Sequence, residues 1–119
     1  MVNEDEISKL LTLSEGELFT AIGADLKPFG FALDKRQDPD KEKDGRDWYQ
    51  THVKRLRASV CQNEKVQMLL SSKRTFGRVE LVAAIIDLVG LVTTGVSPAL
   101  VSVVIVKRGL AEFCSIENE

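Results

Sequence analysis

Residues 97–109 read SPALVSVVIVKRG, and this short stretch decides the fold. Ser97 followed by Pro98 is the pattern of a helix N-cap with proline at the first helical position. Gly109 follows the basic pair Lys107–Arg108, an order typical of a helix C-terminus. The β-branched residues in between favour a strand, but the two capping signals enclose a segment of helical length. We therefore predict a helix between Ser97 and Gly109.

The preceding stretch, VELVAAIIDLVGLV at 79–92, is apolar nearly all round apart from Glu80, Asp87 and Gly90. A helix of this composition belongs in a protein interior or in lipid. The two stretches together predict an apolar C-terminal helical hairpin. A domain of this size is expected to leave part of two such helices uncovered, and we assign that apolar hairpin surface to six residues: Leu81, Ile85, Leu88, Val92, Leu100 and Val104.

Three amphipathic regions precede the hairpin. Apolar residues at helical spacing predict a short helix near the N-terminus, a second that begins at the capping box Ser14–Glu17 and ends before Pro28, and helical structure over 46–72 that is either one bent helix or two. In the segment 34–47 eleven of fourteen residues are charged, which predicts a solvated, mobile loop. The chain of 119 residues has room for one domain. We expect an all-α fold over 1–119, a small bundle of about five helices.

The net charge of −2 conceals opposed blocks. Residues 1–26 carry −5, residues 27–47 cancel, residues 48–79 carry +6 and residues 80–119 carry −3. Complementary patches of this kind steer association between proteins. The residues we assign to the acidic patch are Glu4, Asp5, Glu6, Glu15 and Glu17, and those we assign to the basic patch are Lys54, Arg55, Arg57, Lys73, Arg74 and Arg78.

No motif in the chain carries recognisable chemistry. The single histidine, His52, has no partner acid or nucleophile placed by sequence, and a half-buried or solvated helix histidine is the simpler interpretation. The glycines match neither the P-loop nor the dinucleotide fingerprint. Neither a calcium loop nor a zinc spacing is present. We expect no enzyme activity, no catalytic or metal site, no cofactor and no small-molecule substrate.

The two cysteines, Cys61 and Cys114, lie in apolar or helical settings, and the N-terminal residues lack the apolar core of a signal peptide. These features predict two free thiols and a cytoplasmic location, with a disulfide as the less favoured alternative.

Three functions are compatible with these patterns. We favour a non-enzymatic protein-interaction or self-association module, an adaptor or scaffold that uses the apolar hairpin and the charged patches to bind a protein partner or another copy of itself. The alternative is a membrane-active protein that inserts residues 81–106, a segment whose single charge is Asp87. Nucleic-acid binding through residues 54–78 is disfavoured by the acidic pI of about 5.5.

Overall fold

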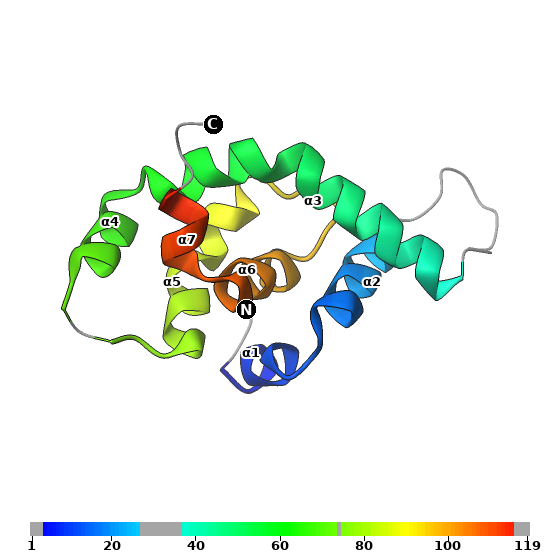
Figure 1. Ribbon diagram of the computed structural model, residues 1–119, viewed down its shortest axis with the longest axis horizontal. Coiled ribbons are helices and arrows are strands. Elements are labelled where there is room, and N and C mark those ends of the chain that lie inside the picture. The colour runs from blue at the N-terminus through cyan, green and yellow to red at the C-terminus, as the bar shows by residue number, and fades with distance from the viewer. Residues whose placement is uncertain (1–3, 27–36, 74, 116–119) are drawn as a thin grey trace.

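The computed structural model describes residues 4–26, 37–73 and 75–115, which form seven helices and no strand. They are α1 (Glu4–Leu11), α2 (Glu15–Asp25), α3 (Asp38–Cys61), α4 (Glu64–Ser71), α5 (Arg78–Gly90), α6 (Pro98–Arg108) and α7 (Leu110–Ser115). The all-α prediction is confirmed, although the count of about five helices was too low. Figure 1 shows α6 at the centre, with α3 crossing one side of the assembly and α4 at its edge.

Helix α6 is the core of the fold because every residue from Ala99 to Val106 is buried. It contacts α1, α2, α5 and α7. The predicted caps are confirmed, since the Ser97 hydroxyl accepts from the Leu100 amide at 3.4 Å and Gly109 closes the helix at a φ of 106°. A β-branched run therefore forms a helix here, because burial on all sides outweighs its strand propensity.

The layer around α6 is fastened by polar contacts from its neighbours. Lys107 donates through Nζ to the carbonyls of Leu11 and Leu13, which holds the α1–α2 connection. The Ser97 amide donates to Asp25 at 3.0 Å and so ties the start of α6 to the end of α2. These bonds pair polar groups that burial would otherwise leave without partners.

The expected loop at 34–47 is wrong for residues 38–47, which form the first turns of α3; residues 34–36 lie outside the described part of the chain. Pro39 stands in the first turn, and Asp40 accepts from the Gln37 amide at 3.3 Å. Arg46 pairs with Glu42 at 2.8 Å, four residues earlier. Charged residues at this spacing stabilise a solvated helix face, a pattern that charge content alone does not distinguish from a loop.

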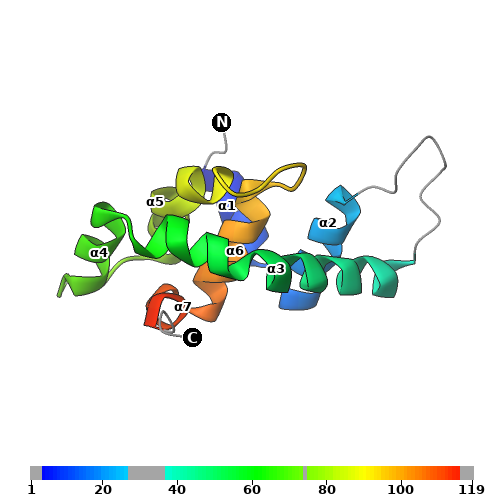
Figure 2. The same ribbon diagram turned by 90° about the horizontal axis from the view of Figure 1, so that it is seen from above.

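The backbones of helices α2 and α3 approach each other closely at two glycines. A Cβ added at Gly23 would lie 1.8 Å from the carbonyl oxygen of Lys41, and one added at Gly45 would lie 2.1 Å from that of Phe19. Glycine at both positions permits this contact, because it has no side chain to keep the two backbones apart. The charged first turns of α3 therefore pack directly against α2 (Figure 2).

The region 46–72, left open by periodicity, is two helices. Helix α3 ends at Cys61, and the Asn63 side chain caps α4 by accepting from the amides of Lys65 and Val66.

The prediction of two free thiols is also wrong. Cys61 at the end of α3 and Cys114 in α7 form a disulfide across 53 residues of sequence. Their pairing is a product of tertiary packing, because α7 lies against α3 only once α6 has returned the chain to it.

Candidate functional site

The six residues assigned to the apolar hairpin surface belong to the core and not to the surface. Ile85, Val92, Leu100 and Val104 are buried, while Leu81 and Leu88 are half-buried and pack against the core. The expectation of an uncovered hairpin is therefore wrong, because the surrounding helices cover α6 completely. Helix α5 turns Ala83, Ala84 and Asp87 outward, so its exposed side is small and polar.

The acidic residues separate into two groups. Glu4, Asp5 and Glu6 are exposed in the first turn of α1. Glu17 completes the capping box of α2, and its carboxylate accepts from the Ser14 amide at 2.9 Å. Glu15 pairs within the chain, at 2.7 Å from Arg108 and 3.4 Å from Arg46.

The basic residues also fail to form one patch. Lys54 and Arg55 are exposed on α3, whereas Lys73 and Arg78 lie beyond α4 and flank the α4–α5 connection. Arg57 is half-buried and turned toward α7, and Arg74 lies outside the described residues. Helix α4 separates the two exposed groups along the sequence.

The large apolar side chains exposed in the described residues are Met68 at 70%, Leu70 at 38% and Leu91 at 77%. Two of the three belong to α4, whose single buried residue is Val66. A helix that buries one residue is weakly anchored by its own packing. Helix α4 thus displays apolar surface without a described neighbour to cover it.

Beside α4 lies a hollow of about 370 Å³ that we call the apolar groove. Its walls come from α4, the α4–α5 connection, α5 and the α6–α7 junction, and its apolar lining includes Leu69, Leu70, Phe76, Leu81 and Leu110. Arg78 and Glu112 supply its charged lining. This hollow is concave, and the exposed Leu70 forms part of its lining.

A second hollow of about 210 Å³, which we call the arginine groove, lies between α3 and the α6–α7 junction. Its lining residues are Tyr49, Gln50, Val53, Arg57, Arg108, Gly109, Glu112 and Phe113. Gly109 and Glu112 line both grooves, which places the start of α7 between them.

Three arginines lie over aromatic rings in and beside the arginine groove. The guanidinium carbon of Arg46 is 4.6 Å from the Phe19 ring centroid, and that of Arg108 is 5.2 Å from both the Phe19 and Tyr49 rings. That of Arg57 is 5.5 Å from the Phe113 ring. Cation–π contacts of this kind hold the guanidinium groups in place.

Electrostatics at this face follow from the same contacts. The hydrogen bond from Arg108 lowers the pKa of Glu15 below its ordinary value, and the reciprocal bond raises the pKa of Arg108. Burial raises the pKa of Tyr49 and so keeps its hydroxyl protonated. Tyr49 is 3% exposed and packs edge-on against Phe19, with ring centroids 5.7 Å apart.

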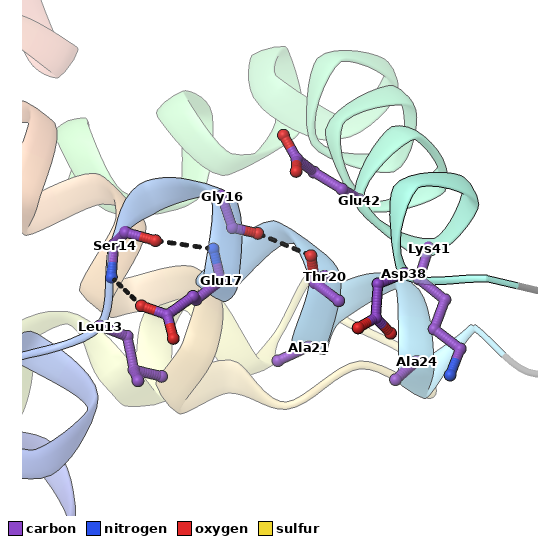
Figure 3. A pocket seen from close by; sticks show the side chains of 10 residues that line it. All are labelled: Leu13, Ser14, Gly16, Glu17, Thr20, Ala21, Ala24, Asp38, Lys41 and Glu42. Atoms are coloured by element: carbon purple, nitrogen blue, oxygen red, sulfur yellow. Dashed lines mark hydrogen bonds between the residues drawn. The ribbon is translucent and has the colours of Figure 1, made fainter.

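Figure 3 shows a larger hollow, about 580 Å³, beside α2 and the start of α3. Three of its polar side chains take part in local structure: Ser14 and Glu17 form the capping box, and the Thr20 hydroxyl donates to the Gly16 carbonyl at 2.8 Å. Glu17 and Asp38 stand at opposite ends of the hollow (Figure 3).

His52 is half-buried on α3, stacks on Trp48 with centroids 4.3 Å apart, and contacts the Trp48 carbonyl through Nδ1 at 2.8 Å. Within the described residues no group of three or more potential ligands is placed to hold a metal ion. A search of those same residues finds no helix with the length and apolarity needed to cross a membrane.

The fold and these surfaces define a small all-α helical bundle whose central helix is buried from Ala99 to Val106. A scan against protein-family models, a search of curated proteins and a search of solved structures give no match to the chain.

Proposed function

We propose that this protein is a non-enzymatic interaction module that binds an acidic, amphipathic helical segment of a protein partner in the apolar groove. The observation that carries the proposal is the exposure of Leu70 at the wall of that groove, on a helix that buries one residue. Contiguous apolar surface on a water-exposed face is characteristic of a contact site.

The shape of the groove favours a helix as the bound element. Apolar grooves between helices recognise the apolar face of an amphipathic helix through side chains three or four residues apart. Leu70, Leu81 and Leu110 provide apolar contact from three separate elements of the bundle. Such a groove contacts a stripe of side chains rather than a single one.

The charge around the groove favours an acidic partner. Residues 62–79 contain Lys65, Lys73, Arg74 and Arg78 against the single acid Glu64. Lys73 is exposed on the α4–α5 connection, and Arg78 is exposed at the start of α5, where it lines the groove. A surface with this excess of positive charge accelerates association with acidic segments and disfavours basic ones.

Self-association is the second candidate, because the exposed acids of α1 in one copy complement the basic connection in another. However, Ile7 in α1 is buried and Leu10 and Leu11 are half-buried. A second copy would therefore present acidic side chains without an apolar stripe. Membrane insertion of residues 81–106 would require α6 to leave the core that it forms.

Fluorescence anisotropy with a labelled 18-residue acidic amphipathic helix tests the proposal. We expect Leu70→Asp to weaken binding about tenfold or more, because it places a charge in an apolar contact. Leu91→Asp is the matched control and should bind as the wild type does, since Leu91 is exposed on the α5–α6 connection, outside the groove. Equal binding of a scrambled peptide, or equal losses in both variants, would contradict the proposal.

Analytical ultracentrifugation at low and high salt separates the two candidates. A dimer that is lost in Leu70→Asp and at high salt would identify a second copy as the occupant of the groove. A monomer that binds the acidic peptide supports a different protein as the partner.

A cytoplasmic location is a further part of the proposal, and the Cys61–Cys114 bond is the observation against it, because disulfides persist mainly in oxidising compartments. Alkylation of the protein at the moment of cell lysis provides the test. Two alkylated thiols would support a reducing location, and none would contradict it.

A further inference from the structure

We infer that the arginine groove is a carboxylate-binding site in which Arg57 is the principal ligand. This site is separate from the proposed function, since it needs no occupant in the apolar groove. The ligand it fits is a carboxylate with a short carbon chain, because the hollow has a volume of about 210 Å³.

The pairing of the three arginines singles out Arg57. Arg46 lies 2.8 Å from Glu42, and Arg108 lies 2.7 Å from Glu15. Among the described residues no carboxylate lies within ion-pair distance of Arg57. Arg57 is therefore the one of these three arginines that forms no ion pair within the described part of the chain.

The orientation of Arg57 is already fixed. Its Nε donates to the Phe113 carbonyl at 3.2 Å, and its guanidinium lies over the Phe113 ring. A guanidinium held through Nε keeps its terminal nitrogens available, and two parallel N–H groups match the two oxygens of a carboxylate. Little rotamer freedom is lost when such a side chain binds its ligand.

The walls of the groove strengthen the interaction. Val53 and Phe113 are apolar, and Tyr49 is almost wholly buried. Charges interact more strongly beside apolar walls than in open water. Arg108 lines the same hollow, and Gln50 adds an amide that can donate to an oxygen.

Glu112 opposes a bound carboxylate, because its negative charge lines the same groove. The site is therefore expected to bind a single carboxylate weakly. Glu112→Gln removes this repulsion and should strengthen carboxylate binding, whereas loss of Arg57 should weaken it.

Two sources offer this chemistry, a free dicarboxylate and a carboxylate within a peptide. Succinate represents the first source, and an N-acetylated tripeptide that contains one glutamate represents the second. In the control peptide glutamine replaces the glutamate and the C-terminus is amidated, so that no carboxylate remains. Tighter binding of succinate would identify a small acid as the natural class. Tighter binding of the peptide would identify a protein segment.

The test is NMR of the arginine side chains in the full-length protein, titrated with each ligand at constant ionic strength. The Nε–Hε resonance of Arg57 should shift and saturate. Arg57→Gln should weaken binding about tenfold, and Glu112→Gln should strengthen it several-fold. Arg55→Gln is the matched control and should change the affinity less than twofold, because Arg55 is exposed on the same helix and does not line the groove.

Arg57→Lys keeps the charge and loses the forked geometry, so it should fall between the wild type and Arg57→Gln. Its backbone spectrum also shows whether a loss of binding reflects a loss of folding. Shifts that sodium chloride reproduces, or equal losses in Arg55→Gln and Arg57→Gln, would overturn the inference. If Leu70→Asp no longer binds the acidic helix but its Arg57 resonance still shifts with the carboxylate ligands, the loss concerns the apolar groove alone.

Discussion

Replacement of Gly23 by alanine should destabilise the protein strongly, because Gly23 lies where α2 meets the backbone of α3. The new Cβ would be 1.8 Å from the Lys41 oxygen and 2.5 Å from its carbonyl carbon. Real Cβ atoms essentially never approach within 3.0 Å, so the helices must separate by more than 1 Å. Both obstructing atoms belong to a helix backbone, which cannot move aside as a side chain can.

Overpacking of this kind costs about 1–3 kcal/mol, and we expect about 3 kcal/mol here because the helices must move as units. Gly16→Ala on the same helix is the control. Its Cβ would lie 3.4 Å from a carboxylate oxygen of Glu42, at the end of a flexible side chain. It should therefore gain the ordinary helix preference for alanine, about 0.5–1 kcal/mol.

Urea unfolding followed by Trp48 fluorescence measures both variants, since Trp48 is the only tryptophan and lies half-buried on α3. We expect the two free energies of unfolding to differ by about 3–4 kcal/mol. Equal stability of Gly23→Ala and Gly16→Ala would refute the close packing of α2 on α3.

Three further perturbations test other contacts of the fold. Cys114→Ser should lower the free energy of unfolding by up to about 4 kcal/mol, because the disulfide closes a loop of 53 residues; an unchanged urea midpoint would contradict this, and reduced wild type should behave like the variant. Ser102→Ala should raise the free energy of unfolding by about 1 kcal/mol, since the buried Ser102 hydroxyl has no hydrogen-bond partner among the described residues; a lower midpoint would count against that assignment. Arg108 lowers the pKa of Glu15, so this pair stabilises the fold above the ordinary pKa of 4.5 and loses its effect as the pH falls through the lower folded value. Because the Glu15 side chain is 43% exposed, the pair contributes less than about 1 kcal/mol. In Glu15→Gln the free energy of unfolding should fall less steeply at acid pH than in the wild type. The same dependence on pH in both proteins would exclude the pair as its cause.

Local signals in the sequence predicted the helices that carry their own caps. Ser14 with Glu17 and Ser97 with Pro98 specify where α2 and α6 begin, because the groups that satisfy the first amides are adjacent in the chain. The positive φ of Gly109 likewise follows from its place after the last turn of α6.

Features that depend on distant parts of the chain were not accessible in this way. The charged residues 38–47 form a helix that packs on α2, with Gly45 against the backbone of Phe19, a contact that composition does not encode. The disulfide joins residues 53 apart, and Arg57 meets the Phe113 carbonyl across 56 residues. The arginine groove therefore exists only after α7 has packed on α3.

The hairpin illustrates a different difficulty. An all-round apolar composition predicted burial for α6 correctly, and the expectation of exposed surface came from assuming too few covering helices. Two of the three large apolar side chains exposed in the described residues belong instead to α4, where Leu70 continues the apolar stripe of the 46–72 region and Met68 lies outside it; the third, Leu91, lies on the α5–α6 connection. Helical periodicity identifies the apolar face of a helix, but it does not show which part of that face remains uncovered in the fold.

Backbone amide shifts on addition of the acidic amphipathic helix test most directly whether the apolar groove is the surface that recognises a partner. The largest shifts should fall in residues 69–72 and 110–112, on the two sides of the groove. Shifts confined to α1 and α2, or no saturable shift at all, would contradict it.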